Sequence, residues 1–458
     1  MSTNIQKNQI TEGIIWRQLL LFFFPILLGT FFQQLYNTID SVIVGQFVGK
    51  EALAAVGGSS AQIVAFVVGF FTGLSSGASV TIAQFFGAKD SRSANKGLHT
   101  AYAIAAFGGL ILTVSGIILT PFLLEMMNTP ADIVADSAVY LRIYFAGIIF
   151  VLIYNMGSAI LRATGDSKRP LYYLIVCCII NIVLDVLFVI VFHMGVMGVA
   201  VATLIAQAVS AVLVTLKLMR SEGILKLSVK QIRFHGSILK MQLKLGLPTG
   251  FEAILFSITN IAIQSAVNPF GTDTTAAWSA YGKLDAIFWM VSTAFGIAIT
   301  TFVGQNYGAG KMDRVRKSTR VCLLMDFIVS AVLVVFLIAA RFLLFRLFTN
   351  DSHVIEIGCD MLVLITPWYI VYVFIEVIAG ALRGVGNVVV PVVITLLGVC
   401  VLRIAWLAAM LKISPTISAI ILSYPVTWVI TALAFIIYYI YITHKTIAGS
   451  SKKHVPKL

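Results

Sequence analysis

The hexapeptide AQFFGA at residues 83–88 decides the fold, because it returns as GQNYGA at residues 304–309, 221 positions later. A second stretch, LRATGD at residues 161–166, returns at the same spacing as LRGVGN at residues 382–387. Two separate matches at one spacing indicate an internal repeat. The chain is therefore expected to consist of two copies of one structural unit.

Each copy contains six apolar segments that are long enough to cross a bilayer, which takes about 20 residues in a helix. The composition agrees with this, since 59% of residues are hydrophobic, 11% are charged and the mean hydropathy is +0.98. Backbone groups in lipid must be hydrogen-bonded within their own segment, so all twelve segments are predicted to be helices. Their expected ranges are 15–39, 53–77, 97–119, 133–154, 170–191 and 195–217, followed by 243–268, 275–303, 320–341, 357–380, 389–411 and 416–442. The predicted fold is thus all-α and polytopic, with twelve transmembrane helices in two parallel six-helix repeats, since an even helix number returns the chain to the same side.

The distribution of Lys and Arg predicts the orientation in the membrane. The outer connections contain only Lys50, Arg341, Arg346 and Lys412, and nearly all other cationic residues fall on the opposite side. The positive-inside rule then places both termini in the cytoplasm. The net charge of +13 is explained by this topology, so we expect no nucleic-acid partner.

The domain organisation follows from the same pattern. We expect an N-terminal lobe over residues 1–217, a basic cytoplasmic linker over 218–242, a C-terminal lobe over 243–442 and a cytoplasmic tail over 443–458. The first apolar segment passes directly into polar residues without a cleavage site, so it is interpreted as an uncleaved span and not as a secretory signal. The expected location is the inner (plasma) membrane.

Signatures of ATP-driven or catalytic machinery are missing from the sequence. There is no phosphate-binding loop of the G-x-x-x-x-G-K-[ST] type and no G-x-S-x-G nucleophile motif. The six histidines are scattered and do not pair with a second metal ligand at helical spacing. We therefore expect neither an enzyme nor a cofactor.

Several polar residues interrupt the apolar segments of the first repeat. Asp40 lies near the end of the first segment, and Asn181 and Asp185 share one face of the fifth segment because they are four residues apart. Thr203 and Gln207 form a similar pair in the sixth segment. A charged side chain at the bilayer centre costs about 2.5–3.5 kcal/mol, so such residues usually serve a function.

Two interpretations of this constellation remain open from the residues alone. The oxygens could bind a hard cation such as Na⁺, or a carboxylate could carry a proton. Alternatively, the side chains could form an internal hydrogen-bond cluster that holds the helices together. At the repeat spacing, the equivalents of Asp40, Asn181 and Asp185 are apolar or aromatic: Ile261, Leu402 and Trp406. Because packing residues should recur with the packing, this asymmetry favours the cation site.

The second repeat carries charges of its own. Glu252 and Glu376 are candidates for lining a substrate cavity, although pairing with Lys283 or Arg403 is equally plausible. The roles of Lys283, Asp285 and Arg403 stay open.

Gly69, Gly73 and Gly77 are spaced by four residues within one segment. Small residues at this spacing allow two membrane helices to approach closely, so they are predicted to be a helix-packing stripe.

Several of these motifs resemble the multidrug and toxic compound extrusion (MATE) family over essentially the whole chain. They are the stretch LYNTID at residues 35–40, the pair Val44-Gly45, the stretch ALAAVG at residues 52–57 and the two repeated loops. The resemblance implies twelve helices in two lobes around a central cavity. It also implies export of drugs in exchange for H⁺ or Na⁺.

The resemblance also implies which residues form the cation site. In the family's damage-inducible branch the first-lobe cation site consists of an Asp, an Asn, an Asp and a Thr, which match Asp40, Asn181, Asp185 and Thr203. In another bacterial branch a second-lobe aspartate stands where this chain has Tyr372. Coupling is therefore expected in the first lobe.

The sequence thus predicts a secondary active efflux antiporter that works by alternating access. We expect it to be a monomer in the lipid bilayer that exports small cationic or amphipathic molecules. The candidates for its substrate cavity are Tyr36, Asn37, Gln207, Glu252 and Glu376. The alternative is a flippase for a lipid-linked precursor, from the same superfamily. The choice between Na⁺ and H⁺ and the substrate range are left open.

Overall fold

The computed structural model describes residues 9–450, and within that range every regular element is a helix. Twelve helical segments of the described chain are long and apolar enough to cross a membrane. They are Ile15–Val48, Lys50–Gly87, Ser91–Met126, Val134–Ala163, Lys168–Val191, Gly195–Met219, Gly236–Phe270, Thr272–Gly308, Met312–Arg346, Ser352–Gly384, Val389–Ile413 and Ile417–Thr443. The predicted all-α fold with twelve spans is confirmed. Most helices extend several residues beyond the predicted apolar segments, because their polar ends continue outside the apolar stretch.

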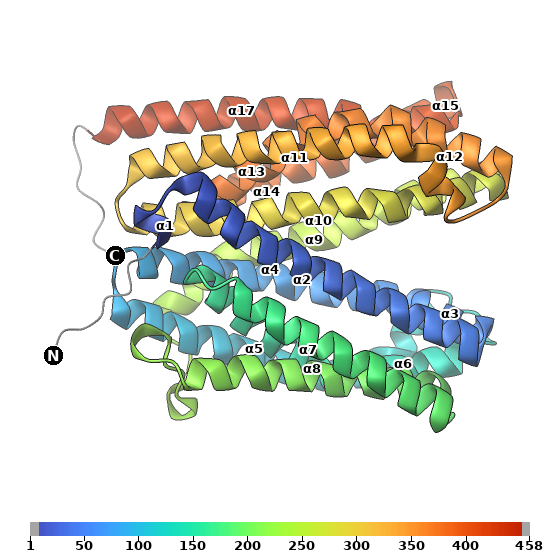
Figure 1. The fold of residues 1–458 in the computed structure, drawn as a ribbon, viewed down its shortest axis with the longest axis horizontal. Coiled ribbons are helices and arrows are strands. Elements are labelled where there is room, and N and C mark those ends of the chain that lie inside the picture. Colours follow the sequence, from blue (N-terminus) through green and yellow to red (C-terminus); the bar gives the residue numbers. More distant parts are fainter. Residues whose placement is uncertain (1–8, 451–458) are drawn as a thin grey trace. The chain divides into compact units, whose positions relative to one another are not determined.

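The elements of the first half begin with α1 (Gln9–Glu12) and α2 (Ile15–Ile43) (Figure 1). They continue with η1 (Val44–Val48), α3 (Lys50–Gly57), α4 (Ser59–Gly87), α5 (Ser91–Met126), α6 (Val134–Ala163), α7 (Lys168–Asp185), η2 (Val186–Val191) and α8 (Gly195–Met219). Two short turns, η3 (Gly223–Leu225) and η4 (Val229–Gln231), lie between α8 and the second half.

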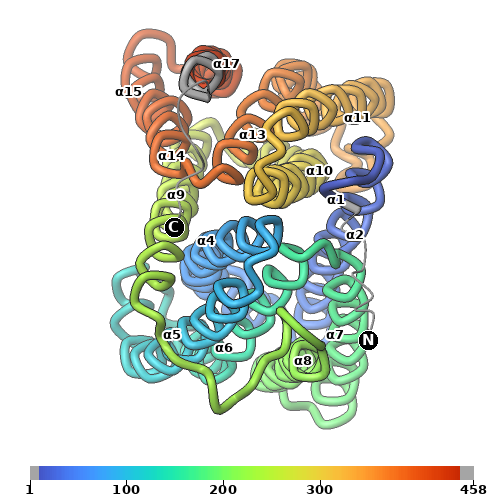
Figure 2. Tube along the Cα trace, turned by 90° about the vertical axis from the view of Figure 1, so that its left-hand side faces the viewer, coloured from blue at the N-terminus to red at the C-terminus, as the bar shows by residue number. Residues whose placement is uncertain are grey.

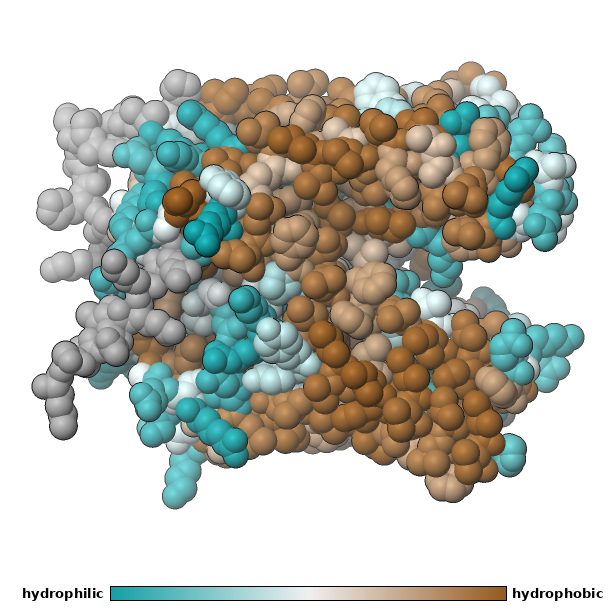
Figure 3. Space-filling model, in the orientation of Figure 1, coloured by the Kyte–Doolittle hydropathy of each residue, from teal (hydrophilic) through white to brown (hydrophobic). Residues whose placement is uncertain are grey.

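The second half begins with α9 (Gly236–Val267), η5 (Asn268–Phe270) and α10 (Thr272–Gly308). It continues with α11 (Met312–Arg346), α12 (Ser352–Ile365), η6 (Thr366–Trp368), α13 (Tyr369–Gly384), α14 (Val389–Thr395), η7 (Leu396–Val401), α15 (Leu402–Ile413), α16 (Ile417–Ile421) and α17 (Ser423–Ser450). Apolar side chains cover the middle of these long helices, and hydrophilic residues gather at their ends (Figure 3).

The chain packs as two compact units whose boundaries fall inside helices. The N-terminal unit is Phe22–Ala253, and the C-terminal unit joins the described residues up to Leu21 with those from Ile254 onward. The boundaries therefore lie within α2 and α9, and not in the basic segment between the halves. Figure 2 shows α1 beside α10 and α11, within the C-terminal unit. There, Arg314 donates hydrogen bonds of 2.9 Å to the backbone oxygens of Ile10 and Gly13.

The internal repeat is visible in the backbone of the connecting turns. Lys89 and Gly310 both have a positive φ, 57° and 71°, and they are 221 residues apart. Gly165 and Gly386, at the same spacing, have φ of 96° and 87°. Residues at positive φ are uncommon outside glycine, so their recurrence supports the duplication predicted from the sequence.

The basic segment between the halves is held against the start of α5. The side chain of Asn95 donates to the backbone oxygens of Ile224 and Lys226, each at 3.1 Å. The Nε2 atom of His99 accepts from the backbone N–H of Ser228 at 3.0 Å. Burial and the nearby cations lower the pKa of His235, which ends this segment. The irregular part spans 220–235, so the last seven residues of the predicted linker belong to α9. The ends of the chain, residues 1–8 and 451–458, lie outside the described residues.

The glycine stripe of α4 packs directly against α9 within the N-terminal unit. A Cβ atom at Gly73 would lie 2.4 Å from the backbone nitrogen of Gly250. A Cβ atom at Gly77 would lie 2.4 Å from the backbone nitrogen of Gly246. The helix-packing interpretation is confirmed at Gly73 and Gly77, where only glycine leaves room for the two backbones.

Candidate functional site

Four polar side chains predicted to bind the coupling ion are buried inside the N-terminal unit. Asp40 comes from α2, Asn181 and Asp185 come from α7, and Thr203 comes from α8. Asn181 and Asp185 expose no surface, and Asp40 and Thr203 expose 8% and 4%. The Asp40 carboxyl interacts with both Asp185 and Asn181, and α8 packs against α7. The structure thus brings Asp40, Asn181 and Asp185 together and places Thr203 on the adjoining helix.

The two carboxylates are next to segments of π-helix. Asp185 is the last residue of α7, which continues directly as η2, and Asp40 lies one turn before η1. The two π-helical segments contact each other. Such segments are rare and frequently mark functional sites. The local backbone therefore departs from the regular α-helix at the place where the charged groups meet.

Most polar atoms of these four residues have no hydrogen-bond partner. They are Oδ1 of Asp40, both side-chain polar atoms of Asn181, both carboxylate oxygens of Asp185 and Oγ1 of Thr203. Buried polar side chains in proteins are nearly always hydrogen-bonded. The side chain of Asp40 nevertheless interacts with those of Asp185 and Asn181, so the two interpretations, an ion site and an internal cluster, both stay predictions.

The chemistry of these groups suits a small hard cation. Carboxylate, amide and hydroxyl oxygens are ligands of hard cations, and carboxylates also accept protons. Two carboxylates close together in a buried site repel each other unless a positive charge lies between them. The site therefore favours binding of one cation or proton.

Two tyrosines of α6 approach this cluster and were not predicted. Tyr36 of α2 interacts with Asp40 and also with Tyr140 and Tyr144. The rings of Tyr140 and Tyr144 are stacked, with centroids 6.2 Å apart. Their spacing of four residues on one helical face was a usable signal in the sequence.

The other first-half candidates are less buried. Gln207 is half-buried on α8, and Asn37 is exposed on α2. Neither is among the residues whose side chains interact with Asp40 or Asp185, so their place in a substrate cavity stays a prediction.

Glu376 pairs with Arg383, with Oε1 and Nη2 3.5 Å apart. The predicted alternatives, pairing with Lys283 or with Arg403, are wrong for Glu376. The reason is local, because Glu376 and Arg383 are seven residues apart on α13 and therefore lie on the same helical face. Glu252 is half-buried on the part of α9 that belongs to the N-terminal unit.

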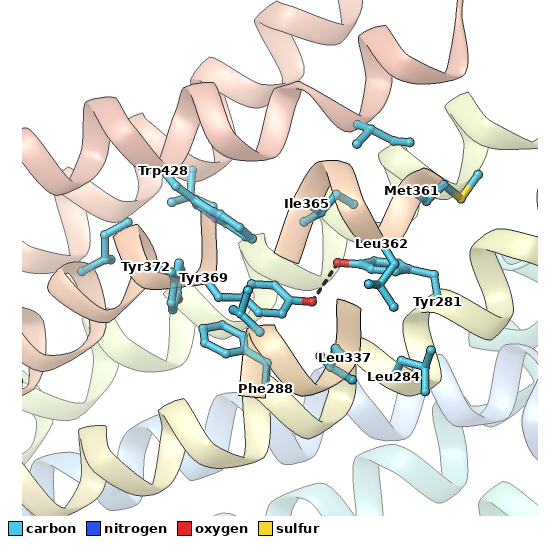
Figure 4. Packing of buried hydrophobic residues seen from close by; sticks show 14 of the residues in the cluster. Tyr281, Leu284, Phe288, Leu337, Met361, Leu362, Ile365, Tyr369, Tyr372 and Trp428 are labelled. Carbon is cyan, nitrogen blue, oxygen red and sulfur yellow. Dashed lines mark hydrogen bonds between the residues drawn. The ribbon is translucent and has the colours of Figure 1, made fainter. Parts of the chain in front are cut away.

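A pocket of about 480 Å³ lies within the C-terminal unit, between α9, α10, α13, α15 and α17. Asp285, Glu376 and Arg403 line it together with Tyr372 and several other aromatic residues. Figure 4 shows the aromatic cluster beside it, in which the hydroxyls of Tyr281 and Tyr369 point toward each other. These hydroxyls are 2.9 Å apart.

Asp326 of α11 is a buried carboxylate that sequence reasoning missed, although it interrupts the apolar segment 320–341. It exposes no surface, and its Oδ1 accepts a hydrogen bond of 3.2 Å from Ser330. Its Oδ2 has no partner, and its charge interacts with Glu376. The C-terminal unit therefore also holds a pair of acidic groups.

Comparison with known proteins identifies the family of this chain. The sequence model of the MatE family matches residues 25–187 and 248–407. These two stretches correspond to the two copies of the internal repeat and together cover most of the chain.

Curated relatives align over most of their length. The probable multidrug resistance protein YoeA of Bacillus subtilis (strain 168) is 30% identical over 393 residues, which cover 84% of each chain. The probable multidrug resistance protein NorM of Thermotoga maritima is 27% identical over 420 residues, which cover 89% of this chain and 88% of the relative.

Solved structures share the fold at lower identity. A multidrug resistance MATE family transporter of the MOP superfamily, in an outward-facing conformation, superposes with a TM-score of 0.89 at 20% identity and covers 99% of this chain and 100% of that one. A MOP superfamily transporter from Pyrococcus furiosus Vc1, described as having a binding pocket of reverse polarity, gives a TM-score of 0.90 at 20% identity and the same coverage.

Proposed function

Because this chain belongs to the MatE family of multidrug efflux transporters, and is thus a multi-pass membrane transporter and not an enzyme, we propose that it exports small organic cations in exchange for H⁺ or Na⁺. The observation that carries the proposal is the buried group of Asp40, Asn181 and Asp185 with its unpartnered polar atoms. Two buried carboxylates that lie close together are costly in the membrane, and a mobile positive charge that binds between them best explains their presence.

The proposed cycle uses this positive charge to shift a conformational equilibrium. Binding of a cation removes the repulsion between Asp40 and Asp185, which favours the conformation that holds the two carboxylates closest. α2 carries Asp40, and Pro25 within this helix removes one backbone hydrogen bond and so weakens its regular ladder. Cation binding thereby changes the position of α2, and the two halves alternate access to the two sides of the membrane.

Transport measured with one gradient at a time tests this proposal. Purified protein in liposomes, loaded with ethidium as the organic cation, should move the dye faster when an inward Na⁺ or proton gradient is imposed. The two gradients are applied separately, so that the coupling ion is identified. Equal dye movement with and without either gradient would contradict antiport.

We further propose that the protein acts as a monomer in the plasma membrane with both termini and the 220–235 segment in the cytoplasm. The support is the concentration of Lys and Arg on that side. Lys230 lies in the segment between the halves and Asp273 in the first turn of α10; both are exposed, and they are on opposite predicted sides.

Single cysteines test this orientation. A membrane-impermeant thiol reagent applied to intact cells should label Asp273→Cys and leave Lys230→Cys unlabelled until the membrane is opened. The five native cysteines are buried and should contribute little background. Labelling of Lys230→Cys in intact cells would reverse the topology.

A further inference from the structure

A basic pocket lies at the start of α5, where the 220–235 segment passes this helix on its way from α8 to α9 (Figure 2). The pocket has a volume of about 340 Å³ and belongs entirely to the N-terminal unit. Arg92 and Lys96 of α5 line it together with Lys230 and Arg233 of the 220–235 segment. Two histidines and two side-chain amides complete the lining, and none of these described lining residues is acidic.

Hydrogen bonds between α5 and the 220–235 segment hold the walls of this pocket in place. His99 is buried, its Nδ1 lies 2.8 Å from the backbone oxygen of Asn95, and its Nε2 accepts from the backbone N–H of Ser228 at 3.0 Å. At the other end of the pocket, Nδ1 of His235 lies 3.1 Å from Oγ1 of Thr100. The cationic side chains are therefore presented to the pocket from two sides that are fixed relative to each other.

The positive charges around the pocket are not balanced by ion pairs. Asp90, which caps α5, interacts with Arg92 but does not line the pocket. Lys96, Lys230 and Arg233 take part in none of the ion pairs found among the described residues. Several like charges that face one cavity repel each other, and an anion between them removes that repulsion.

His235 reports the positive potential at this place. Burial lowers the pKa of its ring, and the charges of Arg233 and Lys96 lower the pKa further. The ring is therefore neutral near pH 7. In this form its Nε2 accepts a hydrogen bond of 3.3 Å from Nε of Arg233. The same potential that disfavours a charged histidine favours a bound anion.

Exposed apolar side chains flank the basic ones. Phe234 follows Arg233 and is exposed, and its ring meets that of Phe107 edge-on, with ring centres 5.9 Å apart. Phe107 is an exposed residue of the membrane-spanning helix α5. Val229, which precedes Lys230, is also exposed. Cationic groups and apolar side chains thus lie together at the end of a span, which is an arrangement typical of sites for anionic lipid headgroups.

We propose that this basic pocket binds a phosphate group that carries an uncompensated negative charge. Guanidinium and ammonium groups are the usual partners of phosphate oxygens in proteins. The exposed apolar side chains beside the pocket favour an anionic phospholipid as the source of the phosphate, and a free phosphate shares the same chemistry. The inference does not depend on antiport, although placing the lipid in the cytoplasmic leaflet rests on the proposed orientation.

Thermal unfolding of the full chain, purified in an uncharged detergent, tests the pocket. The chain is titrated with phosphatidylglycerol, with phosphatidylcholine of identical acyl chains, and with inorganic phosphate, each at constant physiological ionic strength. A ligand that binds the folded state raises the unfolding temperature once its concentration exceeds its Kd. We expect phosphatidylglycerol to act at an at least about tenfold lower concentration than phosphatidylcholine, whose own ammonium group compensates the phosphate charge.

Two double variants assign this preference to the pocket. Lys96→Gln combined with Lys230→Gln removes two charges from the lining and should make the two lipids act at equal concentrations. Lys226→Gln combined with Lys240→Gln removes the same charge from two exposed residues nearby that do not line the pocket, and it should keep the preference. Size-exclusion profiles check folding, and the exposed Lys230→Gln alone replaces the first variant if that variant does not fold.

The outcomes separate a pocket from a general attraction and one source of phosphate from the other. Equal loss of the preference in both double variants would mean that lipid is attracted by the basic surface as a whole, which overturns the proposal. Stabilisation by inorganic phosphate that needs Lys96 and Lys230, without a preference between the lipids, supports the phosphate site with a free phosphate as its source. No preference between the lipids and no effect of inorganic phosphate overturns the proposal. No gradient or dye is used, so these results are independent of the test of antiport.

Discussion

Asp40→Asn and Asp185→Asn should each abolish the build-up of a substrate gradient while the protein still reaches the membrane. Asn has nearly the same shape as Asp, so packing is kept, but the charge that binds the coupling ion is lost. Coupling free energies between two ligands are typically about 1–3 kcal/mol, or about 5–150-fold in affinity. We therefore expect gradient-driven ethidium export to fall by at least about tenfold in either variant, measured in liposomes with matched protein content.

An exposed aspartate provides the control for this result. Asp132→Asn makes the same chemical change in the connection before α6, where the side chain is exposed, and should leave export unchanged. Trp406, the repeat equivalent of Asp185, is a less suitable control because its Nε1 donates to the backbone oxygen of Ala419 at 2.8 Å. If both Asn variants export ethidium at the wild-type rate, Asp40 and Asp185 do not bind the coupling ion and their cluster has only a structural role.

Gly73→Ala and Gly77→Ala should lower the yield of folded protein severely. Each added Cβ would lie 2.4 Å from a backbone nitrogen of α9, and a backbone atom cannot move aside as the end of a flexible side chain can. Overpacking typically costs about 1–3 kcal/mol. Here the two helices must separate, so the loss should reach or exceed the upper end of that range. Thermal unfolding of the purified variants, followed by size-exclusion chromatography, measures the effect.

Gly69 supplies a control from the same stripe. A Cβ atom there would meet the Cβ of Ala253 at 3.5 Å, which is an ordinary contact. Gly69→Ala should therefore be neutral or slightly stabilising, because Ala favours a helix over Gly by up to about 1 kcal/mol. A similar small effect at Gly73 and Gly77 would show that α4 and α9 do not pack as closely as in this structure.

The candidates for binding the coupling ion show which site residues can be predicted from the sequence alone. Asn181 and Asp185 share a helical face by their spacing alone, and the cost of a carboxylate in an apolar segment singled out Asp40. That these residues from α2 and α7 interact is a fact of packing between segments some 140 residues apart in sequence. The spacing of Tyr140 and Tyr144 indicates that they share one face of α6, but nothing in the sequence of α6 says which helix that face meets.

The charged residues of the second half differ in how far the sequence reveals their neighbours. The spacing of Glu376 and Arg383 was sufficient to pair them, yet more distant cations were considered in its place. For Arg403, no spacing in the sequence could reveal that Tyr424 and Trp428 cover its guanidinium, because these residues lie on a different helix.

The sequence by itself determined the twelve spans, the duplication and the glycine stripe. Each of these depends on local hydropathy, on a repeated spacing or on residue size, and all three are properties of the chain read along its length. Only the tertiary structure decided where the two compact units divide, because Leu21 and Ile254 pack with the C-terminal unit although each lies inside a continuous helix. It also decided that Asp285 accepts hydrogen bonds from three donors and that the guanidinium of Arg403 lies over the ring of Tyr424, since contacts between helices depend on how their faces meet.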